Sequence, residues 1–309
     1  MQEGRPSRTA IAAASMRAAH VLLDDEPKIL RDDLALGLSG VASEAALRAA
    51  LDRIQIEVAR QTTPEFAQSF LRYGRGLAVW RSRYVEDELE QALQRGVTQY
   101  VILGAGLDSF AYRRPDITKV VHVFEVDHPA TQHWKRTRLH ALSVEVPPTV
   151  TFVPLDFEKQ TLQEGLRVGG YHSEEPGVFS WLGVTPYLTE DAIFGTLKGV
   201  AALAAGTEII FEYEVPEALL DAEGQRLAAA TRAFATARGE PWLSLFDPAS
   251  LRAQVQALGF VAIKDVGPEE ATARYFAGRG DGLRTYPFAH LMKAQVSSHA
   301  SSASTQDTP

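Results

Sequence analysis

Cysteine is absent from the 309-residue sequence, which excludes disulfide bonds and zinc sites with thiolate ligands. Long apolar runs are absent as well, since none approaches the roughly 18 residues that a membrane-spanning helix needs. The Ala-rich stretch 10–23 contains Arg17 and His20, so it lacks the apolar centre of a signal peptide. We therefore expect a cytoplasmic protein without a membrane partner.

An excess of basic residues is also missing, because 31 Lys and Arg stand against 39 Asp and Glu and the formal net charge is -8. A general nucleic-acid-binding protein needs a basic face, which this charge balance does not favour. His128 and His133 are wrongly spaced to place two metal ligands on one helical face. We expect no nucleic-acid partner and no metal.

The apolar pattern changes near residue 96. Before it, apolar residues recur at helical spacing and predict a helical N-terminal cap over residues 1–95, with helix starts at Pro27 and Ser43. After it, short apolar runs rich in β-branched residues alternate with helical stretches, as in a buried parallel sheet. The predicted strands are 100–103, 120–126, 149–155, 177–182, 208–213, 260–266 and 288–296.

This alternation predicts an α/β fold, namely a doubly wound, Rossmann-like sheet of seven strands within residues 96–296. Predicted helices cover 190–205, capped by Thr189, then 216–238, then a stretch from Asp247 to Gly259. We expect a helical lid insertion at about 216–240 and a disordered polar tail over 297–309.

A glycine-rich loop, Gly104-Ala105-Gly106, follows the first predicted strand. Glycine lets the chain turn sharply and lets a ligand approach the backbone closely. A dinucleotide fingerprint would need a third glycine where Ser109 stands, and Asp108 would repel a pyrophosphate. The loop therefore disfavours NAD and suits a cofactor that carries sulfonium and ammonium groups.

Acidic residues follow the next two predicted strands. Glu125 and Asp127 lie about 20 positions past the glycines and share one face by period 2, so either could accept ribose hydroxyls. Asp156 and Phe157 end the third strand, where a carboxylate beside an aromatic ring suits an adenine site. Together with the loop, these acids indicate S-adenosylmethionine as the cofactor.

Three motifs resemble the leucine carboxyl methyltransferase family, and within it the bacterial branch of O-methyltransferases that includes polyketide carboxyl methyltransferases. The motifs are RSRYVED at 81–87, VILGAGLDS at 101–109 and FEVDHP at 124–129, with RYFAGR at 274–279 as a later match. The resemblance implies the seven-stranded methyltransferase sheet and S-adenosyl-L-methionine as cofactor, with S-adenosyl-L-homocysteine as product.

The resemblance also implies residue roles. Arg83, with Arg81 as a close rival, resembles the arginine that contacts the carboxylate of the cofactor, and Arg17 or Arg8 would supply a second basic residue. Gly104, Ala105 and Gly106 would pass the methionine moiety, Asp127 would bind ribose, and Asp156 and Phe157 would bind adenine. Leu182 departs from the family, whose eukaryotic members carry an acidic residue there.

The methyl acceptor is the least readable part of the sequence. Tyr187, Glu212 and Tyr213 stand at the ends of the fourth and fifth strands, where such sheets bind ligands, so Tyr187 and Tyr213 are the catalytic candidates. A carboxylate acceptor would need no base, whereas an alcohol or phenol would want one.

We expect an O-methyltransferase that acts on a carboxylate or hydroxyl of a small, polyketide-like molecule in secondary metabolism. The alternatives are an NAD(P)-dependent oxidoreductase and a non-catalytic protein that binds S-adenosylmethionine. The sequence leaves the oligomeric state open, with a homodimer as one option.

Overall fold

The computed structural model describes residues 7–155 and 161–298. Within them, all seven predicted strands are present, each with ends within two residues of the prediction. The strands are β1 (Gln99–Leu103), β2 (His122–Asp127), β3 (Val150–Pro154), β4 (Gly177–Trp181), β5 (Glu208–Glu214), β6 (Phe260–Val266) and β7 (Ala289–Val296).

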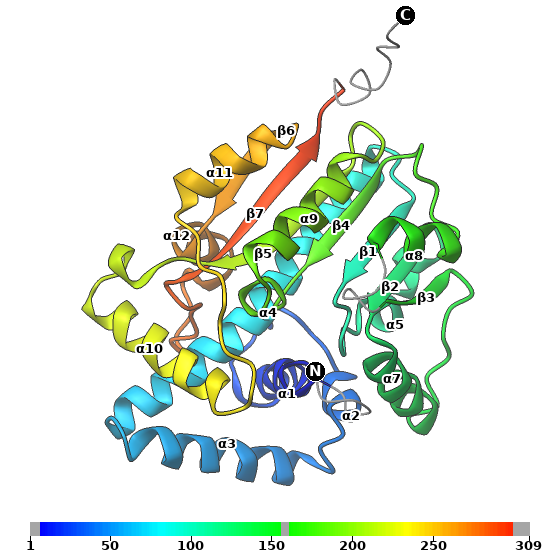
Figure 1. Cartoon of the computed structure of the whole chain (residues 1–309). Helices are drawn as coiled ribbons and strands as arrows, with labels where there is room; N and C mark the ends of the chain where they lie inside the picture. The colour runs from blue at the N-terminus through cyan, green and yellow to red at the C-terminus, as the bar shows by residue number, and fades with distance from the viewer. Residues whose placement is uncertain (1–6, 156–160, 299–309) are drawn as a thin grey trace, which may run out of the picture.

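The strands form one sheet in the order β3-β2-β1-β4-β5-β7-β6 (Figure 1). β1 to β5 run parallel, while β7 inserts antiparallel between β5 and β6. The chain winds outward in one direction from β1 and then in the other from β4, so the switch point lies between these two strands. Ligands bind such sheets at the carboxyl ends beside the switch point. The predicted fold class is confirmed.

Twelve α-helices are present in the described residues, and several begin where the sequence predicted. Ser43, Thr189 and Asp247 each accept a hydrogen bond from the backbone N–H three residues later, as N-caps do. The helices are α1 (Arg8–Leu23), α2 (Ala35–Ser39), α3 (Glu44–Ala59), α4 (Pro64–Gln94), α5 (Phe110–Arg113), α6 (Pro115–Thr118), α7 (Pro129–Ala141), α8 (Leu162–Gly169), α9 (Glu190–Ala201), α10 (Ala222–Thr236), α11 (Pro248–Ala257) and α12 (Pro268–Ala271).

The prediction of a helix that starts at Pro27 was wrong. The chain between α1 and α2 is irregular, and several of its backbone groups bond to side chains from other parts of the fold. Arg279 donates to the carbonyls of Asp25 and Pro27, and the backbone N–H of Ile29 donates to His20. Tertiary hydrogen bonds thus replace the helical ones that proline at a first helical position would favour.

The helix predicted over 216–238 is divided. A short 3-10 turn, Glu217–Leu219, precedes α10, and the carboxylate of Asp221 accepts the N–H of Gly224 to start the second piece. The helix after β4 is also shorter than predicted, because α9 ends at Ala201. Alanine continued the helical pattern in the sequence, but the chain turns there to enter β5.

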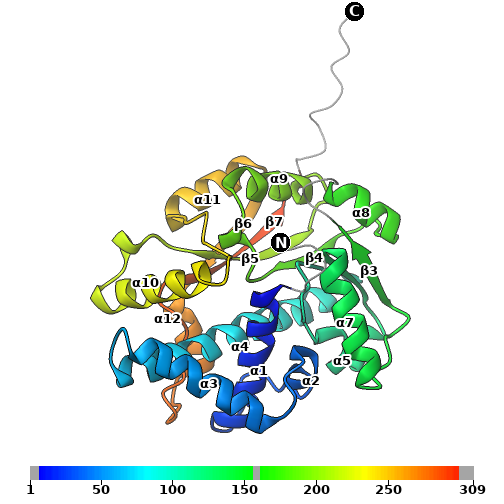
Figure 2. The same ribbon diagram turned by 60° about the horizontal axis from the view of Figure 1, so that its bottom comes forward.

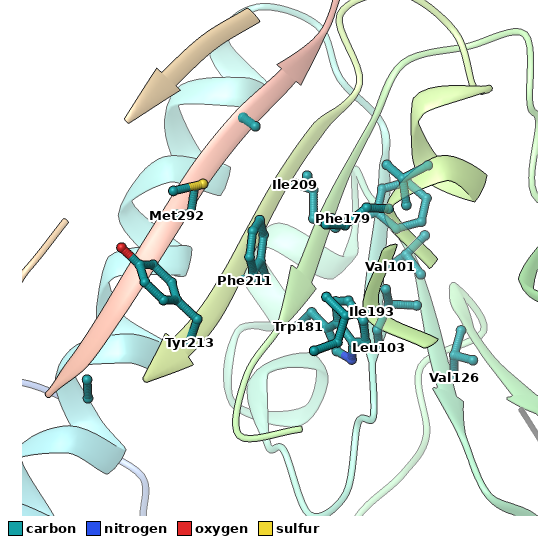
Figure 3. Packing of buried hydrophobic residues seen from close by; sticks show 14 of the residues in the cluster. Val101, Leu103, Val126, Phe179, Trp181, Ile193, Ile209, Phe211, Tyr213 and Met292 are labelled. Carbon is teal, nitrogen blue, oxygen red and sulfur yellow. The ribbon is translucent and has the colours of Figure 1, made fainter. Parts of the chain in front are cut away.

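Helices cover both faces of the sheet. Figure 1 shows α9 and α11 in front and α4 behind, and each face has its own core. On the front, Leu103, Trp181 and Phe211 pack from neighbouring strands under Ile193 of α9 (Figure 3). On the back, α4 packs on alternate strand residues such as Ile102. None of the helices in the described ranges is both long and apolar enough to cross a membrane.

A third group of helices lies across the carboxyl ends of the strands. Figures 1 and 2 both show α1, α3 and α10 gathered on the side toward which β4 and β5 point. α1 reaches the glycine loop, since a Cβ on Gly106 would lie 3.2 Å from that of Ala10. These helices enclose the edge of the sheet where the predicted site residues lie.

Candidate active site

The glycine loop turns sharply at the end of β1. Gly104 and Gly106 have φ of 64° and 48°, a left-handed backbone that residues with a side chain rarely adopt. A Cβ on Gly104 would lie 2.4 Å from Cγ2 of Val184, in the turn after β4. The loops that follow β1 and β4 therefore touch, and glycine at 104 leaves the room for that contact.

Asp127 closes the other side of this loop. It ends β2, and its carboxylate accepts hydrogen bonds from the backbone N–H groups of Gly106 and His128. The side chain is only partly exposed, and burial raises the pKa of Asp127 although both N–H groups oppose the shift. Each carboxylate oxygen has two lone pairs, so acceptor capacity remains for a ligand at the rim.

Glu125 is not available to a ligand in this way. Its side chain is fully buried, forms a 2.7 Å ion pair with Lys135 and accepts a hydrogen bond from the Tyr112 hydroxyl. The two acids that the sequence left as alternatives thus differ, because only Asp127 lies at the rim of the loop. Burial and the pair to Lys135 assign Glu125 to the packing between β2 and α7.

Arg17 of α1 lies against the same loop. Its guanidinium donates to the Leu107 carbonyl at 2.6 Å and to Asp32 at 2.7 Å, and Asp32 also accepts the Ser109 hydroxyl. Burial tends to raise the pKa of Asp32, but the positive charges of Arg17 and Arg113 hold that pKa below its usual range. Arg8 begins the same helix and is exposed.

Arg81 and Arg83 point to different places. The Arg81 guanidinium donates to Glu212 at 2.6 Å and lies against Gly183, just past β4. Arg83 is 44% exposed, pairs with Asp87 one turn along α4, and lines a surface groove next to Pro27. Positions two apart on a helix differ by about 200° in direction. The structure therefore brings Arg81, and not Arg83, to the carboxyl edge of the sheet.

Glu212 joins this edge from β5. Its carboxylate accepts both Arg81 and the backbone N–H of Gly183, each at 2.6 Å. Leu182, the residue that departs from the family pattern, is partly buried and packs on the core beside α4. A carboxylate thus lies beside the β4 end after all, but it comes from the neighbouring strand.

The model of the leucine carboxyl methyltransferase family matches residues 10–201, which include the loop, Asp127 and both arginines. YktD of Bacillus subtilis (strain 168), named a "Putative S-adenosyl-L-methionine-dependent methyltransferase", is 33% identical over 217 residues, or 69% of this chain and 70% of that protein. The chain belongs to the leucine carboxyl methyltransferase family.

A second relative and two solved structures are also similar to this chain. A relative of the same description from Mycolicibacterium gilvum (strain PYR-GCK) is 32% identical over 179 residues, 57% of this chain and 55% of that protein. A solved DUF574 family protein from Streptomyces avermitilis has a TM-score of 0.58 at 15% identity, with 94% of this chain and 97% of that one covered. A "putative methyltransferase" from Thermobifida fusca has a TM-score of 0.55 at 17% identity, with 96% and 97% covered.

These two solved structures share the fold. Family membership confirms the predicted resemblance, the enzyme class and the cofactor: this protein is an S-adenosylmethionine-dependent methyltransferase. The adenine candidates Asp156 and Phe157 lie outside the described residues. Within the described ranges, no three His, Asp or Glu side chains are grouped so that they could hold a metal ion.

The two catalytic candidates of this methyltransferase lie apart. The Tyr213 hydroxyl donates to Asp265 at 2.7 Å, and its ring lies by Met292 of β7, away from Leu103 at the end of β1 (Figure 3). Tyr187 follows β4, in the turn that also holds Val184, and is half-buried. The structure brings Tyr187 to the edge near the loop and leaves Tyr213 farther along the front of the sheet, beside β7 and β6.

Glu214 is a residue at this edge that sequence reasoning missed. It ends β5 two positions after Glu212, is 3% exposed, and its Oε2 has no hydrogen-bond partner among the described residues. Burial comes first, and the charges of Glu214 and Glu212 next, in raising the pKa of the Tyr187 hydroxyl. The signal was present in the sequence, since two carboxylates stand at alternate positions at the end of a strand whose middle is apolar.

Proposed function

We propose that this protein transfers the methyl group of S-adenosylmethionine to an oxygen of a small, polyketide-like acceptor. What supports this is the convergence of the loops after β1, β2 and β4 with the end of β5 at one edge, beneath α1 and α10. The bound cofactor supplies the electrophilic methyl carbon, and the residues of this chain supply binding, orientation and exclusion of water.

The glycine loop fits the cofactor on steric and electrostatic grounds. The left-handed backbone at Gly104 and Gly106 makes the sharp turn that lets a loop pass close to a ligand. Asp127 retains lone pairs at the rim and would accept the ribose hydroxyls. Asp156 and Phe157, outside the described residues, remain our candidates for the adenine.

A cation is needed for the carboxylate of the cofactor. We assign it to Arg81, which Glu212 holds at 2.6 Å while its remaining N–H groups can donate elsewhere. Arg17, fixed by Asp32 at the loop, is the second candidate. Arg83, which the resemblance suggested first, lies on a different face of α4.

The acceptor oxygen is more consistent with a hydroxyl than with a carboxylate. Glu212 and Glu214 are both buried at the end of β5, and the nearby Arg81 is the cation that we assign to the carboxylate of the cofactor. A carboxylate acceptor brought to the same edge would be repelled by these acids in a medium of low dielectric constant. The leucine carboxyl group in the family name is therefore the less favoured acceptor here.

Calorimetric titration with S-adenosylhomocysteine and with NAD tests the cofactor part of the proposal. We expect binding of S-adenosylhomocysteine and none of NAD. A screen of hydroxyl and carboxyl compounds with methyl-labelled S-adenosylmethionine tests the acceptor part. Label that enters only carboxylic acids would contradict the preference for a hydroxyl.

A further inference from the structure

Glu214 ends β5 with its side chain buried, 3% exposed, at the carboxyl edge of the sheet. Its backbone is fixed, because it pairs with Ala289 of β7 and its carbonyl accepts the N–H of Phe246 at 2.9 Å. Four ionisable groups interact electrostatically with its carboxyl group. They are Glu212 on β5, Arg81 on α4, Tyr187 after β4 and Tyr286 before β7.

None of these groups satisfies the Glu214 side chain. Arg81 donates to Glu212, the Tyr286 hydroxyl donates to the Phe70 carbonyl at 2.9 Å, and Oε2 of Glu214 has no partner in the described residues. Burial, then the negative charge of Glu212, raise the pKa of the Glu214 carboxyl group well above its usual range. A buried, unsatisfied carboxyl group destabilises a fold and is retained where a ligand needs it.

Glu208 shows how a structural glutamate is paired with cations in this strand. It begins β5 on the same face, is 5% exposed, and is paired with Arg95 at 2.6 Å and Lys293 at 3.0 Å. The two residues share strand, face and burial but not partners. Glu214 differs by lying at the carboxyl end, where the loops of the cofactor site meet.

Aromatic side chains surround this end of β5. Tyr286 stacks on Phe288 with ring centroids 4.7 Å apart, and Trp242 packs edge-on against Phe288 at 5.4 Å. Tyr187 and Trp242 are only partly buried. Such surfaces suit a planar aromatic molecule, so the group presented to Glu214 would be a phenolic hydroxyl.

Resting on the proposed function, we propose that Glu214 is the general base that takes the proton from a neutral phenolic acceptor. The hydroxyl oxygen forms the bond to the methyl carbon while the bond from carbon to sulfur breaks and its electron pair stays on sulfur. The hydroxyl proton moves to Oε2 of Glu214, which releases it to water after the product leaves. A carboxylate of raised pKa takes a proton more readily near neutral pH than an ordinary one.

The test compares the full-length protein with Glu214→Gln, Glu214→Asp and the matched control Glu208→Gln. The acceptor probes are 4-methylphenol, which is protonated at neutral pH, and 4-nitrophenol, which ionises readily and needs less help from a base. We expect Glu214→Gln to bind S-adenosylhomocysteine normally, to lose about 100-fold or more in transfer to 4-methylphenol, and to lose far less with 4-nitrophenol. Glu214→Asp should recover part of the lost rate, and Glu208→Gln should resemble the wild type.

A second measurement needs no acceptor. Because the pKa of Glu214 is raised in the folded state, the stability linked to its protonation is present at low pH and lost as pH rises through that pKa. The melting temperature of Glu214→Gln relative to the wild type should therefore increase with pH, while that of Glu208→Gln should not. A difference that stays flat with pH would overturn the assignment of an unpaired buried carboxyl group.

The remaining outcomes separate the two proposals. If the wild type fails to bind S-adenosylhomocysteine, the cofactor assignment fails first. If the wild type binds S-adenosylhomocysteine but methylates neither phenol, the general-base role is overturned and the cofactor assignment stands. The same conclusion follows if Glu214→Gln loses activity toward both phenols by the same factor.

Discussion

The carboxylate of Asp127, at the end of β2, accepts a hydrogen bond from the backbone N–H of Gly106 in the loop after β1. This contact fixes the loop against the neighbouring strand before any ligand arrives. It also places the acid at the rim of the glycine turn, where a ribose would meet both.

Replacement of Asp127 by alanine should weaken binding of S-adenosylhomocysteine by about tenfold or more, because two hydroxyl partners are lost. Isothermal titration calorimetry measures the change. Asp116→Ala, at an exposed acid that pairs with Arg114, serves as the control and should bind as the wild type does. Unchanged affinity in Asp127→Ala would reject the ribose role.

Replacement of Arg81 by lysine should weaken the binding of S-adenosylhomocysteine by about tenfold or more. Lysine lacks the planar guanidinium, so it cannot keep the ion pair with Glu212 and donate to a second carboxylate in the same geometry. Arg83→Lys is the matched change two residues away and should leave the affinity within about twofold. Thermal denaturation of both variants checks that they fold. The opposite ranking would return the assignment to Arg83.

Replacement of Gly104 by alanine should destabilise the protein in two ways. The left-handed backbone costs about 1–2 kcal/mol with a Cβ present, and the clash with Val184 adds about 1–3 kcal/mol. Chemical denaturation measures the sum, and the double variant Gly104→Ala/Val184→Ala should recover the second part. Gly195→Ala in α9, where a Cβ meets nothing within 4 Å, should be neutral or stabilising.

Replacement of Lys135 by methionine should lower the free energy of unfolding by about 3–5 kcal/mol, because it leaves the buried carboxylate of Glu125 without its cation. Lys264→Met removes a lysine that is 51% exposed and paired with Glu270, and should change stability by less than about 1 kcal/mol. Urea denaturation of the two variants gives the comparison. Equal losses would show that burial does not set the strength of the first pair.

The strands and several helix starts could be predicted because their signals are local. Apolar runs and capping residues such as Thr189 act within a few positions along the chain, and the structure follows them. The helix prediction at Pro27 failed because the hydrogen-bond partners of that segment, such as Arg279, come from the far end of the sequence. Local preference there yields to tertiary hydrogen bonds.

Parts of the candidate site could be found only once faces were known. Period 2 in β5 sends Tyr213 to one side and Glu214 to the other, but it does not say which side meets the cofactor loop. For the same reason, the sequence could not decide whether Arg81 or Arg83 on α4 faces the site. Glu125 and Asp127 share a face of β2 and differ in how deeply they are buried. Glu125 forms an ion pair with the buried Lys135, whereas Asp127 lies at the rim of the loop.

The contact between Gly104 and Val184 has a consequence for the affinities of the two ligands. One loop follows the strand of the cofactor site and the other continues to Tyr187, so any ligand that moves one loop must move or strain the other. We therefore expect the two binding events to be linked thermodynamically, with the factor by which the cofactor changes acceptor affinity equal to the factor in the reverse direction. Through the close approach of these two loops, the affinity of the enzyme for the acceptor would depend on whether the cofactor is bound.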